Sequence, residues 1–206
     1  MINGFLLVNK GPGITSSRVV QIVKKKFQLK KVGHLGTLDP MATGLLIIAL
    51  NRATKFASLL LQSEKSYRAE VTLGIQTDTD DAEGEAISSK KVDITELEIK
   101  ETLLTFLGAS YQLPPDYSAL KHKGKPMYKY ARDGIKVEKA ERKIFIKNIQ
   151  NILIEIPKVS FDISCSKGTY IRSIARDLGA RLGCGAHLSG LIRTSQEKFM
   201  LSDACS

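Results

Sequence analysis

Hydrophobic and polar positions along the chain follow two periods, one typical of strands and one typical of helices. Apolar runs bounded by turn residues predict six strands, at residues 4–9, 45–50, 67–73, 143–156, 159–165 and 188–194. Helical spacing predicts helices at residues 15–27, 53–61, 95–108, 126–133 and 170–182. Residues 30–43 and 78–85 are expected to be loops. Because no repeat or linker interrupts this alternation, the pattern predicts a single domain.

Length and charge narrow the class of protein. The chain has 206 residues, enough for one domain with an ample core. Its 31 basic and 21 acidic residues give a net charge of +10, which favours nucleic acid or an anionic membrane as partner. No apolar run approaches the length of a membrane span, and the N-terminal apolar run predicts a strand rather than a signal peptide. Three cysteines, Cys165, Cys184 and Cys205, cannot all pair, so we expect a reducing, cytoplasmic location.

The positive charge is concentrated in one part of the chain. Between Lys121 and Lys147 there are ten Lys or Arg residues and three acidic residues. Tyr117, Tyr128 and Tyr130 lie within or beside this segment. Interleaved cations and aromatic rings suit RNA, because phosphates meet the cations and exposed bases stack on the rings. The alternative is an ordinary solvated, lysine-rich surface.

Motifs for nucleotide cofactors and metals are incomplete. The run Gly11-Pro12-Gly13 lacks the spacing of a dinucleotide loop, and no GxxxxGK[ST] run occurs. Residues 78–84 imitate a calcium loop, but the glycine is one position late and position five is alanine, so we expect a solvated acidic turn. Cys184 and His187 have plausible ligand spacing without a second pair of ligands. We therefore expect neither a cofactor nor a metal site.

Asp39 is the candidate for chemistry. It is the only carboxylate in the first 63 residues, which also hold nine Lys or Arg residues. Glycines and a proline punctuate its loop, and glycine permits tight turns and close approach of a ligand. A carboxylate near cations stays ionised, and it can act as a nucleophile or stabilise an oxocarbenium-like centre at an anomeric carbon. The alternative is a turn residue whose carboxylate bonds its own backbone.

Several segments resemble one known family, in the family's order. The longest is GHLGTLDPMATG at residues 33–44. The others lie at residues 65–69, 77–80, 117–121, 128–134, 165–172 and 182–188. Together they extend from about Phe5 to Thr194, and they are similar to the tRNA pseudouridine synthase B family, the TruB type.

The resemblance implies a role for each residue at a matching position. Asp39 is the expected catalytic aspartate, and Arg172 is expected to pair with it. Tyr67 is expected to pack on the target base and take part in proton transfer, and Tyr170 to contact the flipped nucleotide. We expect Leu191 to line the uracil pocket and His34 to touch the RNA near the extruded base. The expected contacts to the RNA backbone are Lys10, Lys121, Lys123, Lys129, Arg132 and Arg193. For each residue the alternative is an ordinary packing, capping or solvent-facing role.

The resemblance also implies an activity and a fold. The expected reaction converts uridine 55 in the T loop of tRNA to pseudouridine, by base flipping, cleavage of the N-glycosidic bond and reattachment through C5. The expected fold is the α+β pseudouridine synthase fold, a mixed, largely antiparallel sheet flanked by helices and loops, with a basic thumb-like insertion at about residues 109–142. The implied partner is the T arm of tRNA. No cofactor, membrane or protein partner is expected, and we expect a monomer.

The chain departs from the family pattern at three places. Residues 9–13, NKGPG, stand where the family usually shows Asp-Lys-Pro, and residues 191–193 contain one arginine where some relatives have two. The chain ends at Ser206, whereas bacterial members continue into a small RNA-binding domain. We therefore expect residues 1–206 to form one catalytic domain without a C-terminal domain of the PUA type, and to bind tRNA more weakly. Two other functions stay open: a non-catalytic RNA binder, and a carboxylate-dependent glycosidase that releases free base.

Overall fold

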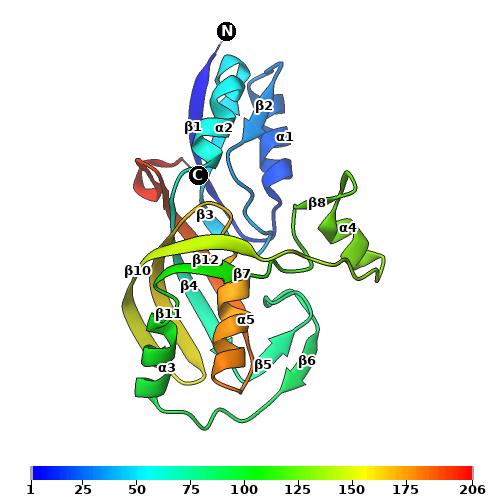
Figure 1. Ribbon diagram of the computed structural model, residues 1–206. Helices are drawn as coiled ribbons and strands as arrows, with labels where there is room; N and C mark the ends of the chain where they lie inside the picture. Colours follow the sequence, from blue (N-terminus) through cyan, green and yellow to red (C-terminus); the bar gives the residue numbers. More distant parts are fainter. Residues whose placement is uncertain (1, 206) are drawn as a thin grey trace. The chain divides into compact units, whose positions relative to one another are not determined.

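Strands and helices occupy most of the chain in the structure, a computed structural model that describes residues 2–205 (Figure 1). The strands are β1 (Gly4–Lys10), β2 (Val32–His34), β3 (Thr43–Leu50), β4 (Lys65–Leu73), β5 (Ile75–Thr77), β6 (Ala86–Ser89), β7 (Gly108–Gln112), β8 (Lys121–His122), β9 (Lys125–Pro126), β10 (Arg142–Glu155), β11 (Lys158–Cys165), β12 (Ala186–Gln196) and β13 (Phe199–Met200). The α-helices are α1 (Ser16–Lys26), α2 (Ala57–Leu61), α3 (Glu96–Leu104), α4 (Met127–Arg132) and α5 (Ile171–Arg181). Two 3₁₀ helices are η1 (Asn51–Phe56) and η2 (Leu201–Asp203).

Nine of the described strands form one mixed sheet. Its order is β1-β3-β12-β4-β11-β10-β7, and β2 and β13 pair with β3 and β12 beside this path. The pairs β1–β3, β2–β3, β10–β7 and β12–β13 are antiparallel, whereas β12 and β3 are parallel, with Arg193 opposite Gly44. This mixed, largely antiparallel sheet confirms the expected fold class.

The chain forms two compact units. The first comprises Met1–Ala69, Asp162–Lys167 and Gly190–Ser206, and the second comprises Glu70–Phe161 and Gly168–Ser189. Strands β4, β11 and β12 pass from one unit to the other part-way along. Asp39, Tyr67 and Leu191 belong to the first unit, and Tyr170 and Arg172 to the second.

The core of the first unit is built on β3. All residues from Leu45 to Ala49 are fully buried, which explains the continuous apolar run, because this strand has side chains packed on both faces. Alternate residues of β3 form a cluster with Leu35 and Ala53. Around it pack Leu7, Ala57, Leu60, Phe199, Leu201 and Ala204. Burial of each Leu or Ile contributes about 1.5–3 kcal/mol, so β3 is a firm base for the loop that precedes it.

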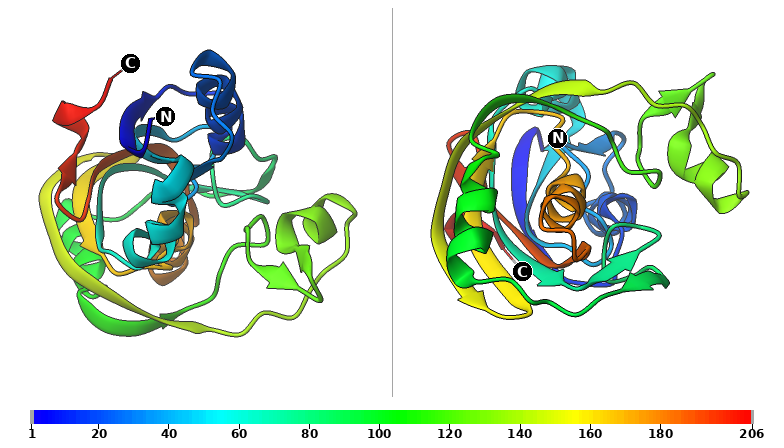
Figure 2. Two further views of the ribbon diagram at one scale, coloured as in Figure 1. Left: turned by 90° about the horizontal axis from the view of Figure 1, so that it is seen from above. Right: turned by 60° about the horizontal axis from the view of Figure 1, so that its bottom comes forward.

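In the second unit, helices cover one face of the long strand β10. Figure 2 shows α3 alongside β10, and the buried side chains of both elements are apolar: Ile99, Leu103, Ile144, Ile146 and Ile149. On α5 the predicted apolar stripe is buried at Ile171, Ile174 and Leu178. Gly179 lets α5 approach the chain before β12, since a Cβ there would overlap the backbone of Gly185 and Ala186.

Short elements account for most differences from the predicted pattern. Strand β2 lies inside the predicted loop at residues 30–43, because it gains pairing partners on β3. The helix predicted at 95–108 ends at Leu104, and Gly108, with φ of +90°, starts strand β7 instead. The hairpin of β5 and β6 was also missed, as were β7 and β13. Each has five residues or fewer, too few for a hydrophobic period to be read.

Candidate active site

The loop that carries Asp39 is fixed by backbone contacts in the first unit. Ser16 Oγ donates to Leu38 O (3.0 Å) and accepts from Leu38 N–H (2.9 Å). The backbone N–H of Ala42 donates to Asp39 O (3.1 Å), and that of Gly13 donates to Pro40 O (2.9 Å). Leu38 is buried and Asp39 is partly exposed, so the carboxylate stands on a loop whose backbone is held on both sides.

Lys10 also holds this loop. Its side chain is 1% exposed, and Nζ donates to the carbonyls of Gly11 (2.9 Å), Ile14 (2.8 Å) and Pro40 (3.0 Å). A buried ammonium that bonds three carbonyls is not available to an RNA phosphate. The expectation that Lys10 contacts the RNA backbone is therefore wrong for this structure, because the loop after β1 folds over the side chain.

Arg193 lies beneath the same loop. It is fully buried, and Nε donates to Leu45 O (2.7 Å) while a terminal nitrogen donates to Gly36 O (3.2 Å). Its guanidinium also hydrogen-bonds the side chain of Tyr67. Gly36 has φ of +116°, and a Cβ there would lie 3.3 Å from Nη1 of Arg193. Arg193 is thus an internal residue of the site, which corrects its expected role as an RNA backbone contact.

Tyr67 joins Asp39 and Arg193 in the first unit. It points to the buried side of β4, and neighbouring Arg68 is exposed. Burial raises the pKa of Tyr67 to about 12, with the negative charge of Asp39 adding to the rise and Arg193 opposing it. The phenol is therefore protonated at neutral pH. Leu191 is buried and precedes Arg193 by two positions on β12, so the two side chains share a face of the strand.

Two further basic groups border this cluster. Burial, and then the charge of Arg193, lower the pKa of His34 below 6.5, so the ring is neutral at neutral pH. Within the described chain, His34 Nδ1 is buried without a hydrogen-bond partner. Lys65 has its pKa lowered to about 8 by burial and by Arg193, and its Cε would be 3.4 Å from a Cβ at Gly36. The sequence reasoning missed Lys65, although it stands two residues from Tyr67 and therefore on the same face of β4.

In the second unit, Tyr170 is held by Gln112. Tyr170 precedes the first residue of α5, and its backbone N–H donates to Gln112 Oε1 (2.8 Å). Gln112 Nε2 donates back to Tyr170 O (3.1 Å), and Gln112 is 3% exposed. This two-way amide contact fixes the backbone at the start of α5. Nothing in the sequence marked Gln112, because its partner is 58 residues away.

Arg172 is buried among groups of the second unit. Its terminal nitrogens donate to Thr79 O (3.1 Å) and Tyr117 O (2.8 Å), and Nε lies 3.6 Å from Oδ2 of Asp81. Arg172 therefore ties the segment after β5 to the segment after β7. Its pairing with Asp39 stays a prediction.

The acidic run at residues 78–84 is a turn, as predicted, but it is solvated only in part: Asp78 and Glu83 are exposed, whereas Asp80 and Asp81 are not. Asp80 is 8% exposed and Asp81 is 4% exposed. Asp80 pairs with Arg176 (3.1 Å), while Asp81 lies beside Arg172 and accepts from Thr79 Oγ1 (2.6 Å). Burial raises the pKa of Asp80, against the opposing charge of Arg176. The burial of Asp80 and Asp81 was not predicted, because the arginines that face these carboxylates come from α5, more than 90 residues later.

The basic segment leaves the sheet between β7 and β10, where Gln112 is opposite Arg142. Figure 1 shows β8 and α4 at the end of two extended connections. Two cations lie against aromatic rings, with Lys125 Nζ 4.7 Å from the Tyr130 ring centre and Arg132 5.6 Å from that of Tyr128. The side chains of this segment that were expected to meet RNA phosphates are exposed: Lys121, Lys123, Lys129 and Arg132.

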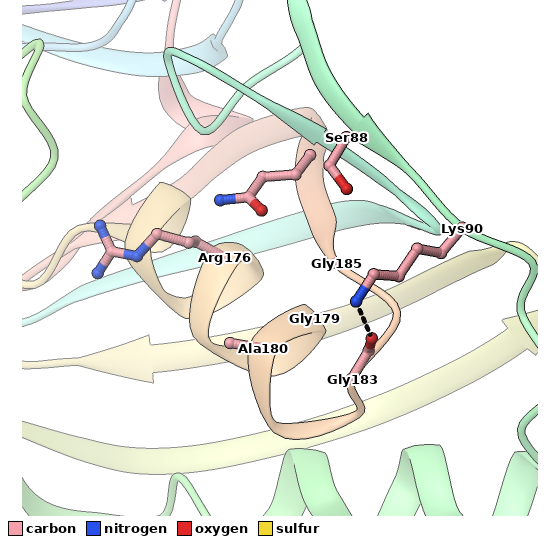
Figure 3. Close-up of a pocket in the computed structure, with 8 residues that line it drawn as sticks. Ser88, Lys90, Arg176, Gly179, Ala180, Gly183 and Gly185 are labelled. Atoms are coloured by element: carbon pink, nitrogen blue, oxygen red, sulfur yellow. Dashed lines mark hydrogen bonds between the residues drawn. The ribbon is translucent and has the colours of Figure 1, made fainter.

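A separate polar pocket lies beside α5 in the second unit (Figure 3). Its charged groups are already bonded: Lys90 Nζ donates to Gly183 O (3.0 Å), and Arg176 pairs with Asp80 and Asp177. The remaining lining residues are Gln76, Ser88, Gly179, Ala180, Gly183 and Gly185. This lining offers no free charge to a ligand, and we assign it no role.

Residues 2–205 contain neither a cluster of metal ligands nor a membrane-spanning helix. Over that range, no three His, Cys, Asp or Glu side chains are placed to hold a metal ion. None of the helices in the same range is long and apolar enough to cross a membrane.

Comparison with known proteins agrees with this geometry. Residues 24–171 match the profile of the TruB family pseudouridylate synthase N-terminal domain. A tRNA pseudouridine synthase B of Alkaliphilus oremlandii is 49% identical over 203 residues, 98% of this chain and 68% of that protein. A tRNA pseudouridine synthase B of Yersinia pestis is 51% identical over 192 residues, 93% of this chain and 59% of that protein.

A solved structure shares the fold. In the crystal structure of a Cbf5-Nop10-Gar1 complex, one chain superimposes with a TM-score of 0.75 at 33% identity, over 96% of this chain and 50% of that chain. Sheet, loop and sequence together define a pseudouridylate synthase fold. The chain belongs to the TruB family of pseudouridylate synthases. It spans 59–68% of the length of the two bacterial relatives.

Proposed function

We propose that this chain is a tRNA pseudouridine synthase that converts uridine 55 in the T loop to pseudouridine, acting as a monomer in the cytoplasm. One observation carries the proposal. In the first unit the charge of Asp39 acts on the buried phenol of Tyr67, and the buried Arg193 hydrogen-bonds the loop of Asp39 at Gly36 O, in a chain that is 49% identical to a tRNA pseudouridine synthase B over 98% of its length.

The reaction is an isomerisation that needs no oxidant, reductant or added group. The bond between N1 of uracil and C1′ of the ribose breaks, the base turns, and a bond forms between C5 and C1′. C5 loses its proton, and N1 gains one, so atoms and charge balance. Electron deficiency develops at C1′ when the first bond breaks, and an ionised carboxylate assists there by covalent attack or by stabilising the positive charge.

Each candidate side chain has a part in this proposal. Asp39 supplies the carboxylate at the sugar. Tyr67 is protonated at neutral pH, so it packs on the base and donates a hydrogen bond rather than removing a proton. Leu191 gives the uracil an apolar wall, and Tyr170 and His34 contact the extruded nucleotide and its RNA. Arg172 pairs with Asp39 when the substrate is bound.

The RNA is held by the basic segment. Lys121, Lys123, Lys129 and Arg132 are exposed, and cations gain affinity from phosphates by releasing counterions. The target base must leave its stack, which costs about a few kcal/mol and least for a base in a loop. We therefore expect the extruded uridine to come from a loop of the RNA, where it can reach the partly exposed Asp39.

The test is incubation with unmodified tRNA, followed by carbodiimide detection of pseudouridine. We expect modification at uridine 55 with the native chain and none with Asp39→Asn, which should still bind tRNA. Asp203→Asn is the matched control, because Asp203 is an exposed acid of the same unit and should keep full activity.

The alternative functions give different results. A non-catalytic RNA binder forms no pseudouridine and loses nothing when Asp39 becomes Asn. A glycosidase releases free uracil, which chromatography detects, whereas an isomerase releases none. Absence of pseudouridine at every uridine of the tRNA would refute the proposal.

A further inference from the structure

Arg193 is a buried cation with neutral partners. In the part of the chain that the structure describes, its hydrogen bonds go to two backbone carbonyls and to the phenol of Tyr67. The side chain is fully buried, and burial of a charge is costly unless every donor is used. A folded protein retains such a buried cation where the guanidinium holds neighbouring groups in positions that an apolar side chain could not fix.

The three partners belong to three different segments. Gly36 lies in the loop of Asp39, Leu45 lies on β3, and Tyr67 lies on β4. A guanidinium is planar and carries its donors in a rigid fork, so it sets both the distance and the angle between groups that it bonds. The contact at Gly36 is close, because a Cβ there would lie 3.3 Å from Nη1 of Arg193 and would require a shift of a few tenths of an ångström.

We propose that Arg193 is a positioning residue, whose guanidinium fork fixes the phenol of Tyr67 against the loop of Asp39. This inference rests on the proposed function. Arginine only donates, so the phenolic oxygen of Tyr67 accepts its hydrogen bond. The phenolic proton is therefore directed away from Arg193, where it can be donated to the substrate base.

The surrounding groups support this arrangement. Burial, and then the charge of Arg193, lower the pKa of both His34 and Lys65, so both side chains lie close to the guanidinium. Gln196, also on β12, donates to Leu35 O and Leu60 O at 2.9 Å each, and holds the residue before Gly36. Side chains of β12 therefore hold the loop at two successive carbonyls, Leu35 O and Gly36 O.

A kinetic experiment separates the fork from the charge. Arg193→Lys keeps the charge and loses the fork, and Arg193→Met loses both. We expect each variant to lower kcat about 100-fold, the effect of a displacement of about 1 Å, with KM changed less than about threefold. In a Tyr67→Phe background the same two substitutions should have little further effect on kcat. Arg68→Met, which removes the exposed arginine next to Tyr67, is the matched control and should leave kcat unchanged.

Two outcomes would overturn the proposal. Full kcat in Arg193→Lys would show that charge alone suffices. An equal loss of kcat with and without the Tyr67 hydroxyl would show that Arg193 does not act through it. If neither Arg193 variant folds, Gly36→Ala crowds the same guanidinium and is the substitute test. An unchanged kcat in Gly36→Ala would contradict the proposal.

A second readout does not depend on activity. The chain has three histidines, so NMR can follow the titration of His34. We expect its pKa to rise in Arg193→Met and to stay low in Arg193→Lys. Melting temperatures complete the cycle: Arg193→Lys should lower the melting temperature less when residue 67 is Phe, and an equal drop would overturn the inference. If the native chain forms no pseudouridine, the proposed function fails, while these measurements still decide whether Arg193 holds Tyr67.

Discussion

The Asp39 loop and the basic segment after β7 resemble each other in sequence and differ in structure. Both contain glycines, both have cations within or beside them, and both were expected to face RNA. At the Asp39 loop the cations Lys10 and Arg193 are buried and bond carbonyls, whereas in the basic segment Lys121, Lys123 and Arg132 are exposed. A cation near a nucleic-acid site is therefore either part of the scaffold or part of the surface, and charge alone does not distinguish them.

The glycines of the two regions differ in the same way. Gly44 has φ of +97°, and a Cβ there would overlap the backbone of Arg193. Gly124 has φ of +82°, and nothing lies within 4 Å of the position of a Cβ. Gly44 is required both by its contact with Arg193 and by its positive φ, whereas Gly124 is required by its positive φ alone.

The largest expected effect is that of Gly44→Ala. The left-handed backbone costs about 1–2 kcal/mol and the overlap with Arg193 about 1–3 kcal/mol, so unfolding in urea should show a loss of about 2–5 kcal/mol. Gly124→Ala is the matched control and should lose only about 1–2 kcal/mol. Equal losses would erase the contrast between the two regions.

Lys10→Met tests the buried ammonium. Three carbonyls lose a charged donor, and since hydrogen bonds to charged groups contribute about 1.5–3 kcal/mol each, a total loss of about 3 kcal/mol is expected after relaxation. Lys123→Met should change the free energy of unfolding by less than about 0.5 kcal/mol, because its side chain is exposed. Chemical denaturation measures the stability of both variants. The prediction is wrong if Lys10→Met is as stable as the native chain.

The double variant Lys121→Ala, Lys123→Ala tests the exposed cations. Each phosphate contact adds about 0.7–0.9 to the slope of log affinity against log salt, so the slope for tRNA should fall by about 1.5. At 0.1 M salt the affinity should drop at least about tenfold, or about 1.4 kcal/mol. Binding titrations at several salt concentrations measure both, and an unchanged slope would make the basic segment an ordinary solvated surface.

The smallest expected effect is a dependence of stability on pH that arises from Lys65. Burial and Arg193 lower its pKa from 10.5 to about 8, so between these values the folded protein binds fewer protons here than the unfolded chain. Stability should therefore rise with pH from about 8 toward 10.5, by about 1 kcal/mol after allowance for solvent screening. Unfolding of Lys65→Met should lack this rise, and Lys55→Met, at an exposed lysine, should retain it.

The sequence predicted the fold where apolar runs are long. Strand β3 was predicted well because its packed faces require an uninterrupted run of large apolar residues. The helix α5 was predicted from apolar residues at helical spacing, of which Ile171, Ile174 and Leu178 are buried, whereas Leu182 follows its last residue and is partly exposed. Short strands such as β5 and β7 depend on partners elsewhere in the chain, so no local pattern marks them.

The site was predictable in part. The glycines around Asp39 indicated a tight loop, but the residue that requires Gly44 lies 149 positions later, and no local pattern shows that contact. Arg193 was expected to contact the RNA backbone from the family resemblance, although its place two residues after Leu191 in a strand already put both on one face. The same alternation would have marked Lys65 as a neighbour of Tyr67.

Because Gln112 pairs with Arg142, the basic segment between them can vary without a change in the sheet. The chain leaves the sheet and returns to it at two adjacent positions, whose Cα atoms are about 5 Å apart in an antiparallel pair. Residues can be added to the excursion, removed from it or replaced without shifting the register of β7 and β10, because doubling the length of a flexible connection costs only about 0.6 kcal/mol. The length and charge of this segment can therefore change while the register of the sheet is kept.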